Sequence, residues 1–397
     1  MTVTPQNSGP LAGVRIVDLT SVISGPGAIG ILTDQGADVI KVEPASGDIM
    51  RSRGPEPGFT PGFVACNRGK RSIVLDLKKP EAADILWRLI ADADVVAQNF
   101  RPGVIERLGF DADEALRRNP RLIYMSISGV GEDGPYAGKR VYDPVIQALS
   151  GIADIQADPV SGRPRMIRTL VGDKTTAIYA AQAITAALYA REKTGTGQHV
   201  RLSMLDTLVS YIWPEGMTAH SIIGKEDRNA RPTPHDMIFP TADGYITLGA
   251  VSDKEWQALC SAINRTDLIS DPRFATPAAR NKNRQERMEV VEEALGAYDT
   301  ETILNSLEAA DVPCAPVLNR MQMLDDAQVR ANNLIHTINQ PGLGPLRQAR
   351  PAARFAGTPA ETVRTAPALG EHTVQILTDI GIDSTEIERL RADKIIG

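Results

Sequence analysis

Short apolar runs rich in β-branched residues alternate with helical segments through the first half of the chain. Such runs are typical of buried strands, and the segments between them have the length of crossover helices. Because parallel strands need crossover connections of this kind, we expect an α/β fold with a Rossmann-like parallel sheet. The expected strands are 14–18, 39–42, 72–77, 95–98, 122–127 and 199–205, and the expected helices include 27–35 and 80–91.

The polar stretch 224–234 ends this alternation. A strand is expected at 245–249, and helical periodicity follows it, so the segment 225–330 is predicted to be a smaller α+β domain. The tail that begins near residue 331 has a proline-rich crossing over 341–351 and an expected final helix over 373–381.

Asp173 is the candidate catalytic residue with the clearest local context. It opens a long run of small apolar residues, 175–190, that predicts a buried helix. A carboxylate there faces the positive end of the helix dipole, and main-chain N–H groups would favour its ionised, nucleophilic form. Asp is also a common helix N-cap, so the motif taken alone favours a structural role.

Asp173 belongs to an ordered set of segments that together resemble the class III CoA-transferases, the CaiB/BaiF-like family of formyl-CoA transferase and carnitine CoA-transferase. This resemblance implies a large CoA-binding domain in 1–224, a small α+β domain in 225–330, and a C-terminal segment, 331–397, that returns to the large domain. It also implies ring-shaped subunits that form an interlocked homodimer. The segments are 10–18, 37–43, 67–76, 99–103, 172–173, 194–198, 239–244, 312–316 and 369–372.

The resemblance implies that CoA moves between an acyl-CoA donor and a carboxylic acid through aspartyl anhydride and aspartyl-CoA intermediates on Asp173. Asp143 matches a second catalytic carboxylate beside the nucleophile, most often Glu in the family; Asp is one methylene shorter, and Asp-Pro is also a common turn start. CoA is then a substrate, and no tightly bound cofactor is expected. The positions that match CoA-binding residues are Ile23, Ser24, Asp76, Leu77, Lys78, Lys79, Asn99, Phe100, Arg101, Arg107, Arg140 and Tyr142.

Basic residues are concentrated locally, and the resemblance assigns several such positions to the phosphates of CoA, although runs of this kind are often only solvated surface. Ile23 stands where formyl-CoA transferase has Gln, and 232–239 lacks that enzyme's glycine-rich flap, so formyl or oxalyl specificity is not expected. The basic residues are Arg68, Lys70, Arg71, Lys78, Lys79, Arg101, Arg107, Lys139 and Arg140.

Two other functions use overlapping features of the sequence. Gly25, Gly27 and Gly30 form a Gly-x-Gly-x-x-Gly motif with Glu43 after the next strand, as in NAD-dependent oxidoreductases. Six residues separate the first strand from Gly25, however, whereas the dinucleotide turn follows its strand at once. The 2-methylacyl-CoA racemases share the expected fold, but they have His where this chain has Tyr142. The glycines of 194–198 are expected only to end a helix.

Composition excludes several other classes of function. With 43 basic and 49 acidic residues, the net charge of -6 gives no global attraction to nucleic acid or anionic lipid. Cys66, Cys260 and Cys314 are far apart, so no disulfide or metal site is expected. No apolar run reaches the roughly 18 residues of a membrane span, and no signal peptide is recognised. A cytoplasmic location is therefore predicted.

Overall fold

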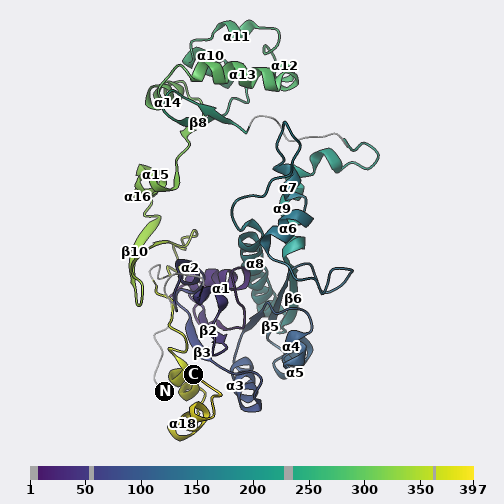
Figure 1. Cartoon of the computed structure of the whole chain (residues 1–397), viewed down its shortest axis with the longest axis vertical. Helices are drawn as coiled ribbons and strands as arrows, with labels where there is room; N and C mark the ends of the chain where they lie inside the picture. Colours follow the sequence, from purple (N-terminus) through teal and green to yellow (C-terminus); the bar gives the residue numbers. More distant parts are fainter. Residues whose placement is uncertain (1–7, 53–57, 228–235, 361–363) are drawn as a thin grey trace. The chain divides into compact units, whose positions relative to one another are not determined.

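The computed structural model describes residues 8–52, 58–227, 236–360 and 364–397. These residues form two compact units, each with its own apolar core (Figure 1). The first unit comprises 1–156, 165–228 and 333–397, and the second comprises 157–164 and 229–332. In the segment 232–239, where a glycine-rich flap was sought, residues 232–235 lie outside the described residues.

The first unit is built on a six-stranded sheet whose neighbouring strands are all parallel, which confirms the predicted α/β sheet. The strand order is β3-β2-β1-β4-β5-β6, so the order reverses between β1 and β4. Open parallel sheets bind ligands beyond the carboxyl ends of the strands at such a reversal. The strands are β1 (Arg15–Asp18), β2 (Asp38–Glu43), β3 (Arg71–Val74), β4 (Val95–Gln98), β5 (Ile123–Ser128) and β6 (Gln198–Ser203).

Helices cover both faces of this sheet (Figure 1). Successive strand residues point to opposite faces, so Val95 and Ala97 join one core and Val96 joins the other. The first core packs against α1 (Ser24–Asp34) and α8 (Val171–Thr194), and the second against α3 (Pro80–Ala91) and the C-terminal helices. The other helices of the unit include α2 (Pro61–Asn67), α4 (Val104–Arg107), α5 (Ala112–Arg118), α6 (Asp143–Leu149), α7 (Ile152–Ile155), α9 (Met204–Gly216), α17 (Thr373–Asp379) and α18 (Ser384–Ala392).

The glycine motif lies inside α1, which begins at Ser24 and not at residue 27 as predicted. A Cβ on Gly25 would lie 2.4 Å from the Thr20 Cβ, and one on Gly30 would lie 2.8 Å from the Cys66 carbonyl oxygen. These glycines therefore allow close packing within the unit, and they do not form a phosphate-binding turn between strand and helix. Glu43 is buried, and both of its carboxylate oxygens accept from Arg51, so its side chain does not face a ribose site.

Helix α8 begins at Val171, one turn earlier than predicted. Asp173 is therefore a residue of the first turn, and the N-cap position belongs to Leu170. The helix ends at Thr194 with Gly195 in the left-handed conformation, at a φ of 78°, as the helix-end interpretation of 194–198 predicted.

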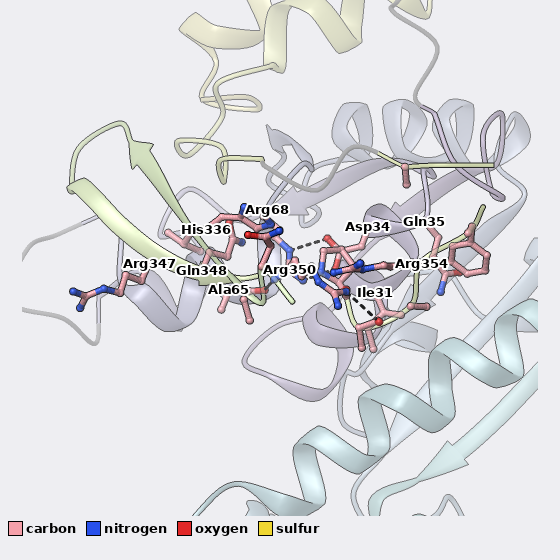
Figure 2. A pocket seen from close by; sticks show the side chains of 18 of the residues that line it. Ile31, Asp34, Gln35, Ala65, Arg68, His336, Arg347, Gln348, Arg350 and Arg354 are labelled. Atoms are coloured by element: carbon pink, nitrogen blue, oxygen red, sulfur yellow. Dashed lines mark hydrogen bonds and ion pairs between the residues drawn. The ribbon is translucent and has the colours of Figure 1, made fainter. Parts of the chain in front are cut away.

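The expected proline-rich crossing over 341–351 is wrong, because this segment belongs to an antiparallel hairpin of β10 (Ile335–Gln340) and β11 (Gly344–Ala349). Pro341 lies in the turn, and Pro345 lies near the start of a two-stranded ribbon, where a missing N–H is tolerated. This hairpin, α1 and α2 line a cavity of about 860 Å³ (Figure 2). None of the predicted site residues lines it. The predicted final helix is α17, and α18 was not predicted.

The second unit packs helices on a three-stranded antiparallel sheet of order β7-β8-β9. Its core includes Phe239, Trp256 and Phe274. The strands are β7 (Ile238–Pro240), β8 (Tyr245–Leu248) and β9 (Cys314–Pro316), and the helices include α10 (Asp253–Ala262), α11 (Asp267–Ser270), α12 (Pro277–Lys282), α13 (Arg284–Leu295), α14 (Thr300–Ala309), α15 (Arg320–Asp325) and α16 (Ala327–Ala331).

A buried ionic cluster lies at the carboxyl ends of β1 and β2. Lys70, only 3 % exposed, places its ammonium 2.8 Å from Asp18 Oδ2 and also donates to the Asn67 side chain. Burial by itself raises the pKa of Asp18, but the charges of Lys70 and Lys41 outweigh burial and hold that pKa below its usual value. The cluster comprises Asp18, Lys41, Glu43, Asp48, Arg51 and Lys70.

Asp18→Asn tests whether this cluster holds the sheet unit together. The substitution keeps the size of the side chain but leaves the Lys70 ammonium buried without its counter-charge, which typically costs about 3–5 kcal/mol. Urea unfolding followed by circular dichroism should show this loss. Glu114→Gln, which removes the exposed pairs with Arg117 and Arg118, is the matched control and should change the midpoint little. Equal midpoints for the two variants would contradict the assignment.

Candidate active site

The crevice at the strand-order reversal is closed by the loop after β1 and the residues after β4. The Ser21 N–H donates to Asn99 Oδ1 at 2.9 Å, and Asn99 Nδ2 donates to the Ser21 carbonyl at 2.8 Å. Lys41 Nζ of β2 donates to the Thr20 carbonyl at 2.8 Å. In the same loop Val22 has a φ of 73°, a strained value for a β-branched residue that its surroundings must maintain.

Beyond this crevice lies a cavity of about 320 Å³ that we call the Asp173 cavity. A neighbouring cavity of about 340 Å³ shares Ser21 and Phe100 with it. The structure thus brings most of the sequence-predicted residues together. The Asp173 cavity is lined by Ser24, Asn99, Phe100, Arg101, Arg140, Tyr142 and Asp173, and the neighbouring cavity by Asp76, Leu77, Lys78 and Phe100.

Four predicted residues line neither cavity. Lys79 donates to the Asp393 carbonyl at the base of the C-terminal helices, and Arg107 is exposed on α4. Ile23 precedes α1 as its N-cap residue. Asp143 lies behind the cavity wall, only 1 % exposed. Because Ile23, Lys79 and Arg107 do not line either cavity, their CoA contacts stay predictions from the resemblance alone.

Asp173 and Asp143 are joined through the backbone. The Asp173 N–H donates to Asp143 Oδ2 at 3.0 Å, and the other oxygen, Oδ1, accepts from Gln147 Nε2 at 2.6 Å. Gly172 allows this approach, because a Cβ there would lie 3.1 Å from Asp143 Oδ2. Despite its shorter side chain, Asp143 therefore reaches the backbone of Asp173.

The electrostatics of Asp173 differ from the sequence-based expectation. Burial, aided by the negative charge of Asp143, raises the pKa of Asp173 to about 6, while hydrogen bonds from the Ser24 side chain and backbone oppose this rise. The expected lowering by the dipole of its own helix was wrong in direction, because partial burial of the carboxyl outweighs it. With a pKa about one unit below neutrality, roughly nine-tenths of the carboxylate is still ionised at pH 7.

Three cationic side chains, Arg101, Lys139 and Arg140, also line the Asp173 cavity. Arg140 Nη2 lies 3.2 Å from the Tyr142 hydroxyl, and no ion pair joins these three cations to a carboxylate in the described part of the chain. An anionic ligand bound in the cavity would neutralise these positive charges.

The basic residues of segment 67–76 differ from those of the cavity, because each of them pairs with a carboxylate. Their interpretation as phosphate ligands or as solvated surface is therefore wrong. Arg68 pairs with Asp34, as Figure 2 shows, and Lys70 pairs with Asp18 in the buried cluster. Arg71 pairs with Asp38 and with Asp379. These cations hold the fold together and do not face the Asp173 cavity.

Sequence reasoning missed several residues of the site. Ser21, Met204 and the turn 129–131 line the Asp173 cavity, and no short motif marks them. Gln147 was also missed, although its position one helical turn after Asp143 could have indicated it. Among the described residues no histidine lines either cavity, so within them the proton-exchange pair of a racemase has no counterpart there.

Neither a metal site nor a membrane span is found in the described residues. No three His, Cys, Asp or Glu side chains come together there as metal ligands would. Likewise, no described helix is both long and apolar enough to cross a bilayer.

Comparisons with known proteins identify the family of this chain. A model of CoA-transferase family III matches residues 11–373. Succinate–glutarate CoA-transferase of Agrobacterium fabrum is 34% identical, with 96% of this chain and 98% of that protein covered. Succinyl-CoA:mesaconate CoA-transferase of Haloarcula marismortui is also 34% identical, covering 97% and 100%.

A solved CaiB/BaiF family protein of Brucella suis has 32% identity and a TM-score of 0.82, covering 94% of this chain and 100% of that one. The family model and the relatives span nearly the whole chain and include both parts of the site, the loop after β1 and the start of α8. The chain therefore belongs to CoA-transferase family III.

Proposed function

We propose that this protein transfers CoA from an acyl-CoA to a free carboxylic acid, with Asp173 as the nucleophile. The observation that carries the proposal is the placement of a mostly ionised carboxylate in a cavity at the sheet's ligand-binding edge, beside three cations without carboxylate partners. The family relatives support the transfer of CoA as the reaction class.

Short dicarboxylic acids are the proposed substrates. Relatives named for succinate, glutarate, mesaconate and D-citramalate transfer support this class. Arg101, Lys139 and Arg140 also supply more than one positive charge to the cavity, which suits a CoA phosphate together with a second carboxylate. The neighbouring cavity, with Lys78, is proposed to hold another part of the nucleotide.

In the proposed mechanism, a carboxylate oxygen of Asp173 attacks the thioester carbonyl of the donor. The C–S bond breaks, and a mixed anhydride and the CoA thiolate form. The thiolate then attacks the aspartyl carbonyl of the anhydride, which expels the donor acid as its carboxylate and leaves aspartyl-CoA.

The second half of the reaction repeats these steps with the acceptor. Its carboxylate attacks aspartyl-CoA, releases the thiolate and forms a second anhydride. The thiolate attacks the acceptor acyl carbon, so the new acyl-CoA forms and the Asp173 carboxylate returns. No external base or ATP is needed, since each leaving group is already an anion.

Ser24 is proposed to steady Asp173 through these steps. Its hydroxyl and N–H lower the pKa of Asp173, and Ser24 lies in the first turn of α1, where a helix N-terminus favours negative charge. Closed surroundings would protect the anhydrides from water. As the family resemblance implies, we further propose a homodimer of interlocked subunits, with the large CoA-binding domain in 1–224 and 331–397.

Asp173→Asn should abolish transfer while the protein stays folded. The amide keeps the size of the side chain but is far less nucleophilic than a carboxylate. Succinyl-CoA with glutarate, read by mass spectrometry of the CoA esters, is the first assay pair, followed by a panel of short dicarboxylic acids. A loss of about 10³-fold or more is expected. Retention of more than a few per cent of activity with a validated pair would disprove the assignment.

The pH dependence gives an independent test. Since a protonated carboxyl cannot attack, kcat/KM for the acyl-CoA should fall below an apparent pKa of about 6. Ser24→Ala removes a hydrogen bond that lowers the pKa of Asp173, so the acid limb should move to higher pH. Thr175→Ala, whose hydroxyl bonds only to backbone of α8, should leave the limb in place. A limb that moves down in Ser24→Ala would contradict the role given to Ser24.

A further inference from the structure

Gln147 is a buried side chain behind the Asp173 cavity, only 2 % exposed. On α6 it lies one turn after Asp143, so the two side chains lie on the same side of the helix. Its Nε2 donates to Asp143 Oδ1 at 2.6 Å and lies 3.3 Å from the carbonyls of Ile167 and Thr169. Its Oε1 accepts from the Ile167 N–H at 2.9 Å.

These contacts fix which way the amide points. Because Oε1 must face the Ile167 N–H, the Nε2 group must face Asp143. Asp143 then accepts one N–H on each oxygen, from Gln147 on Oδ1 and from Asp173 on Oδ2. A carboxylate that accepts a hydrogen bond on each oxygen is held in one orientation.

Gln147 also holds the segment that leads into the nucleophile helix. Ile167 and Thr169 precede α8 by a few residues, and the Thr169 carbonyl accepts from the Val171 N–H at 2.8 Å. One side chain thus contacts both the carboxylate behind Asp173 and the backbone that delivers Asp173 to the cavity.

We propose that Gln147 is a positioning residue that holds the Asp143 carboxylate against the Asp173 amide, and so fixes the place of the negative charge beside Asp173. The importance of Gln147 for catalysis rests on the proposed function. The effect of Gln147 on the protonation of Asp173 does not. Without the Gln147 donor, the Asp143 side chain would no longer be held against the Asp173 amide. Asp173 would then lose a neighbouring negative charge that raises its pKa.

Other charges near Asp173 do not replace this effect. Met204 and Leu208 of α9 pack beside Gly172 and are apolar. Burial makes the largest contribution to the raised pKa of Asp173. Asp143 is the charged residue that raises this pKa further. The remaining titratable or cationic groups that line the cavity or follow Asp173 on its helix are Arg101, Lys139, Arg140, Tyr142 and Lys174.

Gln147→Met tests the proposal because it keeps the volume and removes the donor. Infrared difference spectra with ¹³C-carboxyl aspartate follow protonation directly, and the band absent from Asp173→Asn identifies the nucleophile. The midpoint should be about 6 in the unmodified protein. It should fall by on the order of 0.5–1 pH unit in Gln147→Met, and by a similar amount in Asp143→Asn. Combining the two substitutions should produce no further shift.

Ser150→Ala is the matched control, since its hydroxyl donates to the Gln147 backbone carbonyl and accepts from the Ile152 N–H, and it has no hydrogen bond with Asp143 or Asp173. It should leave the midpoint unchanged. Should Gln147→Met fail to fold by circular dichroism, Gln147→Asn, which keeps an amide too short to span to Asp143, is measured in its place with the same expectation. An unchanged midpoint in a folded Gln147 variant overturns the proposal. The spectra need no substrate, so absence of transferase activity in the unmodified protein would overturn the proposed function separately.

Discussion

The buried Lys70–Asp18 ion pair is the interaction on which the geometry of the site depends. Neither side chain has access to water, so each charge needs the other. Lys70 joins α2 and β3 to the end of β1, and it also donates to the Pro26 carbonyl in the first turn of α1. The start of the helix that meets the nucleophile is therefore tied to the ends of the central strands.

The cluster fixes the surroundings of the Asp173 carboxyl in two steps. Asp18 and Lys41 hold the N–H and the carbonyl of Thr20, which fixes the loop that carries Ser21 and the strained Val22. Ser24 follows, and its hydroxyl and N–H lower the pKa of Asp173. On the other side of Asp173, Asp143 and Gln147 hold its backbone. A carboxylate held from both sides is preorganised for repeated attack and release.

Much of the fold could be predicted because buried parallel strands have a plain signal, and each predicted strand from 14–18 to 199–205 corresponds to a strand of the sheet. Asp173 was found through the resemblance, and the structure places it in the cavity at the strand-order reversal. Pairing was harder to predict. That Arg68, Lys70 and Arg71 neutralise distant carboxylates depends on contacts between strands, which a run of basic letters does not encode.

Two further errors have the same origin. The pKa of Asp173 depends on how deeply the folded chain buries it and on Asp143, thirty residues away, whereas the local sequence shows only the dipole of its own helix. The prolines of 341–351 suggested an irregular crossing, yet they fall at hairpin positions that need no N–H. In both cases tertiary context outweighed a correct local preference.

The central claim is that Asp173 forms a covalent anhydride with each acid, and isotope transfer tests it most directly. The acceptor acid is labelled with oxygen-18 in both carboxyl oxygens, and the enzyme is digested after turnover. Collapse of the second anhydride leaves the bridging oxygen on Asp173, so the peptide that contains Asp173 should gain one oxygen-18 atom, and the labelled peptide should be absent when acyl-CoA is omitted. Rapid formation of the new acyl-CoA with no label in that peptide or in the departing donor acid would contradict the account.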